Sequence, residues 1–411
     1  MKVAVVNRSD IKGGAAIVSL RLVNALNEAG VDARMLVIDK QSDDSLVSII
    51  GSKWVNKWRF FAERLGVFLR NGMKRDTLFQ IDPASHGVDI TTHPWVKQAD
   101  VVCLNWINQG TLSLNNVEQL AESGKPLVWT MHDMWNCTGV CHHAYECGGY
   151  KTTCESCHLL GSKGHDLSTA TQEHKRQLYS GANIHFVAVS NWLADKCRES
   201  SVMHDCDISV IANAFPIEKF STKRLQNSDY GIDDSKKVIV MGAARLDDPV
   251  KGFDLLIATT RYIAKHMPEL AQRLHLVLFG AIKDETLLGQ IALPYTHLGL
   301  VDDVPNVYAH ADVVLSTSLY ETLPGTLIEG QASGCVPVTF GQGGQVDIVD
   351  HLKSGYIADY KDPASVAQGI EWAINAGIER EFLHEEVERK FAASKIAQQY
   401  IELFKKITNQ K

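Results

Sequence analysis

Two glutamates in the second half of the chain have a spacing that suits an anion with hydroxyl groups around it. Glu321 and Glu329 lie eight positions apart in "ETLPGTLIEG" and flank a Leu-Pro-Gly break. Proline suits a first helical turn, so the break predicts a helix that starts near Pro324 or Gly325. The free N–H groups of a helix start suit a phosphate, and the two carboxylates would accept hydrogen bonds from sugar and ribose hydroxyls beside it. The alternative is a solvated Glu321 with Glu329 placed favourably in the helix dipole.

Arg245 and Lys251 are a second candidate pair, six residues apart in "AARLDDPVKGFDLL" after a predicted strand. A planar guanidinium and a compact ammonium together suit a diphosphate and the charge it develops on leaving. Ordinary surface ion pairing is the alternative. The stretch "KGGAA", residues 12–16, follows the first strand and opens a helix, so it is a further candidate phosphate or substrate loop, although it lacks the full G-x-G-x-x-G pattern.

Composition limits the class of protein. The chain has 411 residues, 45% of them apolar, which predicts about two domains with a large core. A net charge of -7 without a long basic run argues against a nucleic-acid binder. The first residues enter a strand directly, and no segment has the length and apolarity of a membrane span, so a cytoplasmic protein is expected.

Short β-branched runs alternate with amphipathic stretches in both halves of the chain, which predicts two doubly wound, Rossmann-like α/β domains that face a central cleft. The first domain is expected over 1–215, with a Cys-rich insertion at 137–160. A linker is expected over 216–235, and the second domain over 236–387. Residues 388–411 are expected to form a last helix that could cross back to the first domain.

Three stretches together resemble one known family. "SLYETLPGTLIEGQASGCVPV", "ARLDDPVKGFD" and "GGQVDIVDHLKSGYIADYKDPASVAQGI" are similar to the second domain of a retaining, family-4-type glycosyltransferase of GT-B fold. "GGAA" near the start and "WTMHDMW" at 129–135 extend the likeness. The resemblance implies that Glu321 lies by the sugar and diphosphate, Glu329 by the ribose, and Arg245 and Lys251 by the diphosphate.

The resemblance also implies roles for residues of the first half and of the helix start. His132 would reach the donor sugar, Gly14 would lie near the reaction centre, and Asn213 would be a weaker donor contact. Gly325 and Thr326 would bind the donor at the helix start. The chain departs from the family pattern at three places: Gly330 stands where Ala is usual, Thr-Leu-Pro-Gly replaces Pro-Phe-Gly, and "VIANAFP" replaces Pro-Asn-Gly.

The implied activity is transfer of a sugar from a UDP- or GDP-sugar to a glycan or lipid-linked acceptor, in surface or exported polysaccharide synthesis. In such a family the acceptor is deprotonated by the departing phosphate, with no protein nucleophile and no metal required for chemistry. A sugar-nucleotide epimerase of GT-B fold is an alternative. A sensor that binds the sugar nucleotide in the same cleft without turnover is another.

Five cysteines lie close together in "CTGVCHHAYECGGYKTTCESCHLL". Zinc prefers four soft ligands in a tetrahedron, and Cys154-x2-Cys157 is a familiar half-site. Cys141 and Cys147 are the expected other half, although a histidine could replace one of them. A structural zinc that holds the loop is therefore expected, with free thiols or a redox or iron–sulfur role as alternatives. The resemblance supports the structural role.

The stretch at 53–75 has seven Lys or Arg against one Glu and an apolar stripe at helical spacing. The stripe comprises Trp54, Trp58, Phe61, Leu65 and Phe68. A helix whose stripe packs on its own domain is one interpretation. An interfacial helix that meets an anionic leaflet, at the inner face of the membrane, is the other. The sequence leaves both open and favours the packed stripe.

Overall fold

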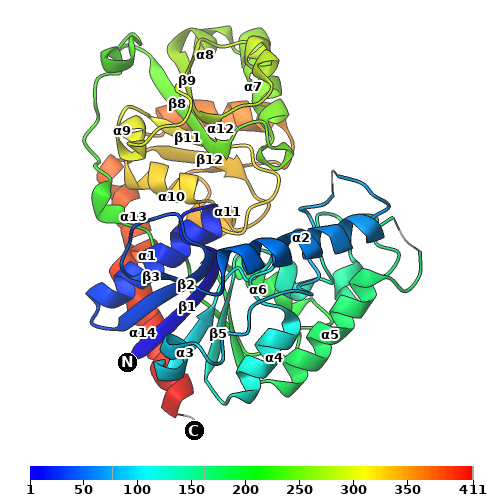
Figure 1. The fold of residues 1–411 in the computed structure, drawn as a ribbon. Helices are drawn as coiled ribbons and strands as arrows, with labels where there is room; N and C mark the ends of the chain where they lie inside the picture. Colours follow the sequence, from blue (N-terminus) through cyan, green and yellow to red (C-terminus); the bar gives the residue numbers. More distant parts are fainter. Residues whose placement is uncertain (76, 162, 410–411) are drawn as a thin grey trace. The chain divides into compact units, whose positions relative to one another are not determined.

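The computed structural model describes residues 1–411 except 76, 162, 410 and 411, and divides the chain into two compact units. The first unit comprises Met1–Ala214 and Ala393–Lys411, and the second comprises Phe215–Ala392. Each unit has a parallel sheet with helices packed on it, as Figure 1 shows for the ribbon. None of the helices in the described part of the chain is long and apolar enough to cross a membrane.

The first unit has a seven-stranded parallel sheet in the order β3-β2-β1-β4-β5-β6-β7. Its strands are β1 (Lys2–Ser9), β2 (Asp32–Asp39), β3 (Val47–Ile49), β4 (Val101–Leu104), β5 (Leu127–Met131), β6 (Ile184–Ala188) and β7 (Ile208–Val210). Its helices are α1 (Gly14–Glu28), α2 (Lys53–Arg70), α3 (Pro94–Gln98), α4 (Leu114–Glu122), α5 (Leu167–Gly181), α6 (Asn191–Arg198) and α14 (Ala393–Asn409), with short 3-10 turns η1 (Trp135–Cys137) and η2 (Gly149–Lys151).

The second unit has a six-stranded parallel sheet in the order β10-β9-β8-β11-β12-β13. Its strands are β8 (Lys237–Arg245), β9 (Leu274–Ala281), β10 (Tyr295–His297), β11 (Val313–Ser316), β12 (Val336–Phe340) and β13 (Tyr356–Ala358). Its helices are α7 (Phe253–His266), α8 (Pro268–Arg273), α9 (Val304–Ala309), α10 (Gly325–Ala332), α11 (Gln345–Ile348), α12 (Pro363–Asn375) and α13 (Arg380–Phe391), with 3-10 turns η3 (Ile217–Lys219), η4 (Asn227–Tyr230), η5 (Pro249–Lys251) and η6 (Glu285–Gln290).

Local sequence explains where several helices begin. Ser113 accepts a hydrogen bond from the Asn116 N–H at the start of α4, and the Asn116 side chain bonds back, which completes a capping box. Asp362 caps α12 by accepting a hydrogen bond from the Ala364 N–H at 2.9 Å, with Pro363 as the first helical residue. Such caps satisfy N–H groups that have no partner within the helix.

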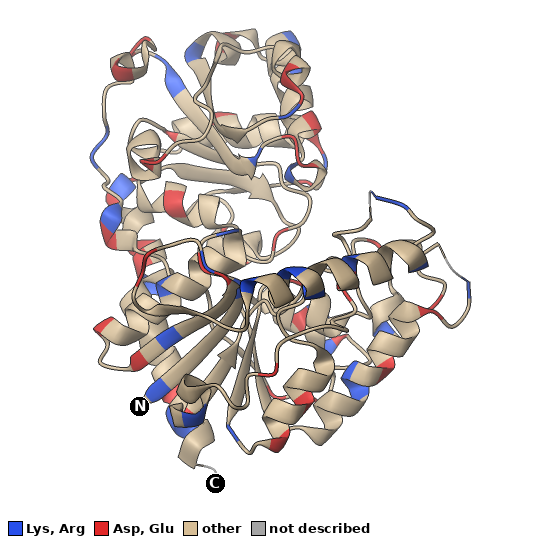
Figure 2. Cartoon of the chain, viewed as in Figure 1, with Lys and Arg blue, Asp and Glu red and all other residues tan. Residues whose placement is uncertain are grey.

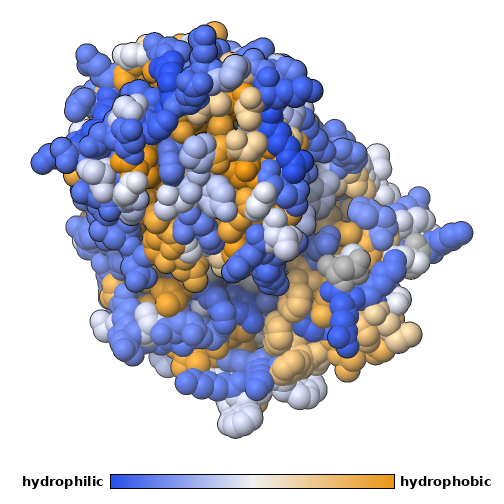
Figure 3. Space-filling view, turned by 90° about the horizontal axis from the view of Figure 1, so that it is seen from above, coloured by the Kyte–Doolittle hydropathy of each residue, from blue (hydrophilic) through white to orange (hydrophobic). Residues whose placement is uncertain are grey.

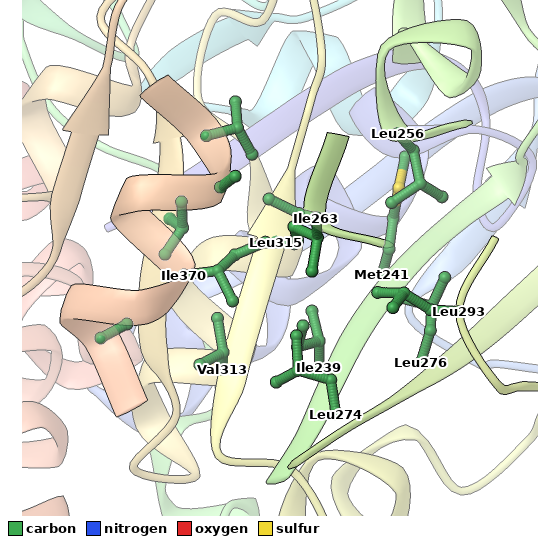
Figure 4. Close-up of a cluster of buried hydrophobic side chains, with 14 of the residues drawn as sticks. Ile239, Met241, Leu256, Ile263, Leu274, Leu276, Leu293, Val313, Leu315 and Ile370 are labelled. Atoms are coloured by element: carbon green, nitrogen blue, oxygen red, sulfur yellow. The ribbon is translucent and has the colours of Figure 1, made fainter. Parts of the chain in front are cut away.

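Buried aliphatic side chains fill the core of each unit because both faces of a parallel sheet are covered. Figure 4 shows part of the second core, where Ile239, Met241 and Leu315 of the sheet meet Leu256 and Ile263 of α7. In the first unit, apolar residues of α14 join the core formed by β1, β2 and α1. The segment "VVLS", which crosses the second core as β11, is buried along its whole length.

The unit boundaries differ from the sequence prediction in two places. Residues 216–235, expected as a linker, belong to the second unit and hold η3 and η4. One cause is Arg224, which pairs with Asp312 at 3.2 Å and donates to the Leu225 carbonyl. The single helix expected at 388–411 is two helices: α13 ends at Phe391 in the second unit, and α14 crosses back to the first unit, where Figure 1 shows it beside α1. Residues 410 and 411 lie outside the described residues.

Helix α2 contradicts the interpretation that its apolar stripe packs on its own domain. Four of the five stripe residues, Trp54, Trp58, Phe61 and Leu65, are exposed and Phe68 is half-buried, whereas the inner face buries Asn56, Glu63, Arg64 and Val67. The prediction fails because polar groups elsewhere in the unit pair with the polar inner face. Figure 3 also shows apolar residues lying among hydrophilic ones on the surface seen from above.

Candidate functional site

An ion pair joins two of the predicted residues in the second unit. Lys251 ends the turn η5 after β8, and Glu321 lies in the loop after β11. The Lys251 ammonium donates to Oε1 of Glu321. Burial alone would lower the pKa of Lys251, but the Glu321 carboxylate outweighs burial and raises that pKa above its usual value. Lys251 is therefore a fixed positive charge at this point of the sheet.

A glycine after Lys251 lets the two loops approach this closely. The Thr317 hydroxyl donates to the carbonyl oxygens of Lys251 at 3.1 Å and Gly252 at 2.9 Å. Gly252 has a φ of 62°, and an added Cβ would lie only 2.2 Å from the Thr317 carbonyl oxygen. A side chain at this position would thus push the Lys251 turn away from β11.

Two glycines that sequence reasoning missed, Gly343 and Gly344, lie against the backbone of Glu321. The Gly344 N–H donates to the Glu321 carbonyl oxygen at 2.9 Å. Its neighbour Gly343 has a φ of 103°, and a Cβ there would lie 2.3 Å from the same oxygen. The signal was the pair of glycines after the strand "VPVTF". Glu321 is therefore held through its backbone by the loop after β12.

Arg245 lies at the carboxyl end of β8. Its guanidinium lies 3.2 Å from Asp248 and 3.4 Å from Asp247. The Lys251 N–H donates to the Asp248 carbonyl at 2.8 Å, and the negative charge of Asp248 also acts on the Lys251 ammonium. Both predicted cations thus lie in the segment that connects β8 to α7, Arg245 at the end of the strand and Lys251 at the end of η5.

Helix α10 begins where the Pro-Gly break predicted. Pro324 is its N-cap, and Gly325 and Thr326 are its first two residues. Glu321 precedes the helix, and Glu329 lies inside it and is half-buried. The helix start therefore has N–H groups and partial positive charge close in sequence to Glu321.

The packing of α10 explains one departure from the family pattern. An added Cβ at Gly330 would lie 2.6 Å from the Cβ of Val314 in β11. The helix therefore lies close to the sheet, where the glycine makes room for a β-branched side chain.

The position of these residues in the sheet favours ligand binding. In the sheet, β9 and β10 lie on one side of β8, and β11, which follows them in the chain, lies on the other side of β8. In open parallel sheets, ligands bind beyond the carboxyl ends of the strands at such a reversal. Lys251 follows β8 and Glu321 follows β11, so the ion pair lies at the reversal.

The first unit holds a second group of predicted residues. His132 follows β5 and Asn213 follows β7, and both line one small cavity with Asn105, Thr130 and Tyr400. Burial lowers the pKa of His132 to about 4, against a smaller opposing effect of Asp133, so the imidazole is neutral at neutral pH.

The contact of His132 with Asn105 assigns its tautomer. Nε2 of His132 lies 2.8 Å from Oδ1 of Asn105, whose amide nitrogen points to Cys103. We therefore assign the proton to Nε2. Sequence reasoning missed Asn105, although it is a polar residue directly after the buried strand β4.

Gly14 is the first residue of α1, at the end of the loop after β1. Its neighbour Gly13 is the N-cap, with a φ of 95°. Val18 and Leu22 of the same helix line the cavity that contains His132. The structure thus brings Gly14's helix, His132 and Asn213 together in the first unit, while Arg245, Lys251, Glu321 and Glu329 belong to the second.

The thiols of the Cys-rich loop are close enough to influence one another. Burial, with smaller contributions from neighbouring thiols, raises the pKa of Cys141 to about 12 and of Cys154 to about 11. The Sγ atoms of Cys147 and Cys154 both lie within 4.0 Å of where a Cβ of Gly149 would be. The thiols suit zinc, but among the described residues no three or more His, Cys, Asp or Glu form a group that could hold a metal ion. The zinc site stays a prediction.

A buried lysine that sequence reasoning missed anchors the start of this loop. Lys175 of α5 donates to the carbonyl oxygens of Trp135, Thr138 and Gly139, the last two at 3.0 Å. Its ammonium lies 3.6 Å from the centre of the Trp135 ring. Burial lowers the pKa of Lys175 to about 7.

Comparison with known proteins identifies the sequence pattern of the second unit. Residues 235–376 match the family described as "Glycosyl transferases group 1". The chain is 30% identical over 183 residues to "Putative glycosyltransferase YtcC" of Bacillus subtilis, which covers 41% of this chain and 43% of that protein. It is 28% identical over 230 residues to "N-acetyl-alpha-D-glucosaminyl L-malate synthase" of Bacillus anthracis, covering 52% and 57%. The chain thus spans about half the length of these curated relatives.

Solved structures match the whole chain. Anabaena Alr3699/HepE, solved in complex with UDP and glucose, is similar with a TM-score of 0.64 and 16% identity, over 98% of this chain and 99% of that one. This likeness and the two parallel sheets confirm the predicted fold class, two α/β units of the GT-B glycosyltransferase fold.

Proposed function

We propose that this chain, whose second unit has the group 1 glycosyltransferase pattern, moves a sugar from a nucleoside-diphosphate sugar to a hydroxyl group of an acceptor. The observation that carries the proposal is the Lys251–Glu321 ion pair, which lies at the strand reversal of the matched region. A cation and a carboxylate at this point suit a diphosphate and a sugar hydroxyl, respectively.

Lys251 and Arg245 would bind the diphosphate. Lys251 at the end of η5 keeps its proton because Glu321 raises its pKa, and Arg245 at the end of β8 adds a second positive charge. When the bond between the sugar carbon and the phosphate oxygen breaks, negative charge builds up on the leaving diphosphate. Preorganised cations stabilise that charge without reorganising during the reaction. The N–H groups of Gly325 and Thr326 would add to this stabilisation.

The carboxylates would orient the sugar and the nucleoside. We assign Glu321 to the sugar and diphosphate, and Glu329 to the ribose hydroxyls. His132, Gly14 and Asn213 of the first unit are assigned to the donor sugar and the reaction centre. His132 is neutral and donates its Nε2 proton to Asn105, so the imidazole would offer the sugar a polar contact without a charge.

The reaction would retain the configuration of the sugar. The acceptor oxygen forms a bond to the anomeric carbon on the face that the phosphate leaves, and the acceptor proton passes to a phosphate oxygen. No protein nucleophile and no metal ion is assigned a step. Catalysis then rests on positioning and charge stabilisation. Determining the anomer of the product by NMR tests the stereochemistry.

We assign a UDP- or GDP-sugar as donor and a glycan or lipid-linked hydroxyl as acceptor. The solved complex of the Anabaena protein holds UDP and glucose, which supports a UDP-sugar over a GDP-sugar as the first donor to test. Synthesis of a surface or exported polysaccharide is the expected context, in the cytoplasm at the inner face of the membrane.

A thermal-shift titration with UDP, GDP, ADP, CMP and dTDP tests the donor site. A ligand at a hundred times its dissociation constant adds about 2.7 kcal/mol of stability, which shifts the melting temperature by several degrees. We expect one nucleoside diphosphate to give this shift, with and without a chelator. The absence of any shift would contradict the proposal.

Two alternative functions are separated by product analysis with the matching sugar nucleotide. An epimerase would change the sugar without an acceptor, and a sensor would bind the nucleotide without turnover. Release of the nucleoside diphosphate together with a glycosylated acceptor supports the transferase.

A further inference from the structure

We propose that helix α2 docks this protein on the surface of an anionic lipid bilayer, with its exposed apolar stripe inserted at the boundary of headgroups and acyl chains. The inference is independent of the proposed transfer reaction. It starts from the orientation of α2, which buries polar side chains and exposes apolar ones.

The exposed stripe is long and lies on one face of the helix. The side chains of Trp54, Trp58 and Leu69 are 82%, 65% and 63% exposed, and Phe61 and Leu65 between them are 56% exposed each. Their spacing of three or four residues places them on the same side of an α-helix. Contiguous apolar surface of this kind marks a site for a protein or a membrane.

The buried face of α2 explains why this stripe is not required by the fold. The Asn56 amide donates to the Ile50 carbonyl at 2.7 Å. Arg64 forms a buried ion pair with Asp82 and donates to the carbonyl oxygens of Leu78 and Ile81. These bonds fix the helix through its inner face. The apolar residues opposite therefore remain available for a partner.

Positive charge lies on both sides of the stripe. At 100° of rotation per residue, Lys53 and Lys57 follow one edge directly, and Arg59 and Arg70 lie further round the other side, between Leu69 and the buried Glu63. Figure 2 shows basic residues in blue along α2. The one acidic residue of the helix, Glu63, is buried on the inner face. An apolar face with basic edges is the pattern of a helix that lies in the interface of an anionic membrane.

A cavity of about 400 Å³ beside the first half of α2 adds to the positive charge. It is lined by the cations Arg8, Lys40, Lys53 and Lys57, by the carboxylate of Asp39 and by apolar residues that include Phe60. Arg8 lies 3.7 Å from Asp39, and its guanidinium lies 5.2 Å from the centre of the Phe60 ring. Four cations against one carboxylate leave net positive charge that suits a phosphate, so we assign the headgroup of an anionic lipid to this cavity.

A bilayer fits this face better than a second copy of the chain. Two copies of α2 related by a two-fold axis would bring the same basic edges together without an exposed acidic partner on the helix. Tryptophan, which occupies two positions of the stripe, is also enriched at membrane–water interfaces.

Vesicle co-sedimentation tests the inference with the full chain. We expect binding to vesicles of phosphatidylcholine with phosphatidylglycerol, weaker binding to phosphatidylcholine alone, and weakening by salt. The double variant Trp58→Glu/Leu65→Glu should lower binding to the anionic vesicles at least about tenfold. The triple variant Lys53→Gln/Lys57→Gln/Arg70→Gln should lower it about fivefold for each charge removed. Leu300→Ser is the matched control, because Leu300 is 76% exposed but lies in the second unit.

The outcomes distinguish the possible occupants. The altered side chains are exposed, so the variants should keep the melting temperature of the wild type. Loss of binding in both α2 variants, with the control unchanged, supports the proposal. Equal binding of all proteins, or no binding of the wild type, overturns it. If the wild type is a dimer that does not bind vesicles, and the Trp58→Glu/Leu65→Glu variant is a monomer, the face belongs to a second copy and the proposal is overturned. If inorganic phosphate raises the melting temperature but vesicles are not bound, the cavity is a site for free anions, and this result also overturns the proposal.

Discussion

The Lys251 ammonium donates to the Glu321 carboxylate across 70 residues of chain. The pair balances a positive charge at the place where we assign the diphosphate. A bound diphosphate would therefore compete with Glu321 for Lys251. The affinity for a nucleoside diphosphate should therefore depend on the charge of residue 321, which a nucleotide titration can measure.

Replacing Glu321→Gln should separate donor binding from transfer. The amide keeps the size of the side chain but removes the anion that pairs with Lys251. We expect transfer to fall about 10²-fold or more, while the affinity for the nucleoside diphosphate stays equal or becomes tighter. Activity assays and calorimetric titration measure the two effects. Glu371→Gln on the exposed surface of α12 is the control, and full activity of Glu321→Gln would refute the assignment.

Replacing Gly252→Ala should weaken the second unit and move Lys251. The new Cβ would meet the Thr317 carbonyl oxygen at 2.2 Å, at a φ of 62° that alanine disfavours. We expect a loss of about 1–3 kcal/mol in the free energy of unfolding, with weaker nucleotide binding. Gly289→Ala is the matched control, because its added Cβ has no neighbour within 4 Å and its backbone is unstrained. Equal denaturation midpoints for both variants would contradict the packing described.

Glu63 should make stability depend on pH. Burial, with the nearby Asp82 charge, raises the pKa of Glu63 to about 8, against the opposing effect of Arg64. The folded state then holds a proton that the unfolded state loses above about pH 4.5. The contribution of Glu63 to stability is therefore fully present below pH 4.5 and is lost as the pH rises to about 8.

The variant Glu63→Gln isolates that effect. We expect it to gain stability relative to wild type as the pH rises from 5 to 8, by on the order of a few kcal/mol. Denaturant unfolding at several pH values measures the difference. Glu122→Gln, at an exposed position of α4, should leave the pH profile unchanged. A constant difference between Glu63→Gln and wild type across this range would rule out the proposed titration.

The zinc prediction is tested by metal analysis of the purified protein. We expect one zinc per chain, released by a strong chelator with a fall in melting temperature, because a structural metal stabilises only the folded loop. Cys154→Ser and Cys157→Ser should lose the metal. Cys206→Ser, outside the loop, should keep it. Nine titratable thiols and no bound metal would establish free cysteines instead, and iron with sulfide would establish a cluster.

Features set by local sequence were predictable. The start of α10 follows from a Pro-Gly break, and the strand before it follows from a run of buried β-branched residues. Lys251 and Arg245 could be assigned to one turn because six residues separate them. Each of these inferences depends on neighbours in the chain.

Features set by distant partners were not predictable. The stripe of α2 has helical spacing, but spacing does not say which side faces inward. That choice depends on Asp82 and on the carbonyl groups that Arg64 reaches. Gly343 was missed for the same reason, because the need for glycine there comes from its close contact with the backbone of Glu321, a residue distant in sequence.

The return of α14 to the first unit has a consequence for synthesis on the ribosome. Phe404 and Tyr400 complete a core whose other members include Val3 and Leu22. The ribosome makes the whole second unit before these residues emerge. The core around β1 and β2 is therefore incomplete until α14 has been synthesised. A premature stop codon that removes only α14 would therefore leave the beginning of the chain incompletely covered, a target for chaperones and proteases, while the intervening unit has all of its own residues.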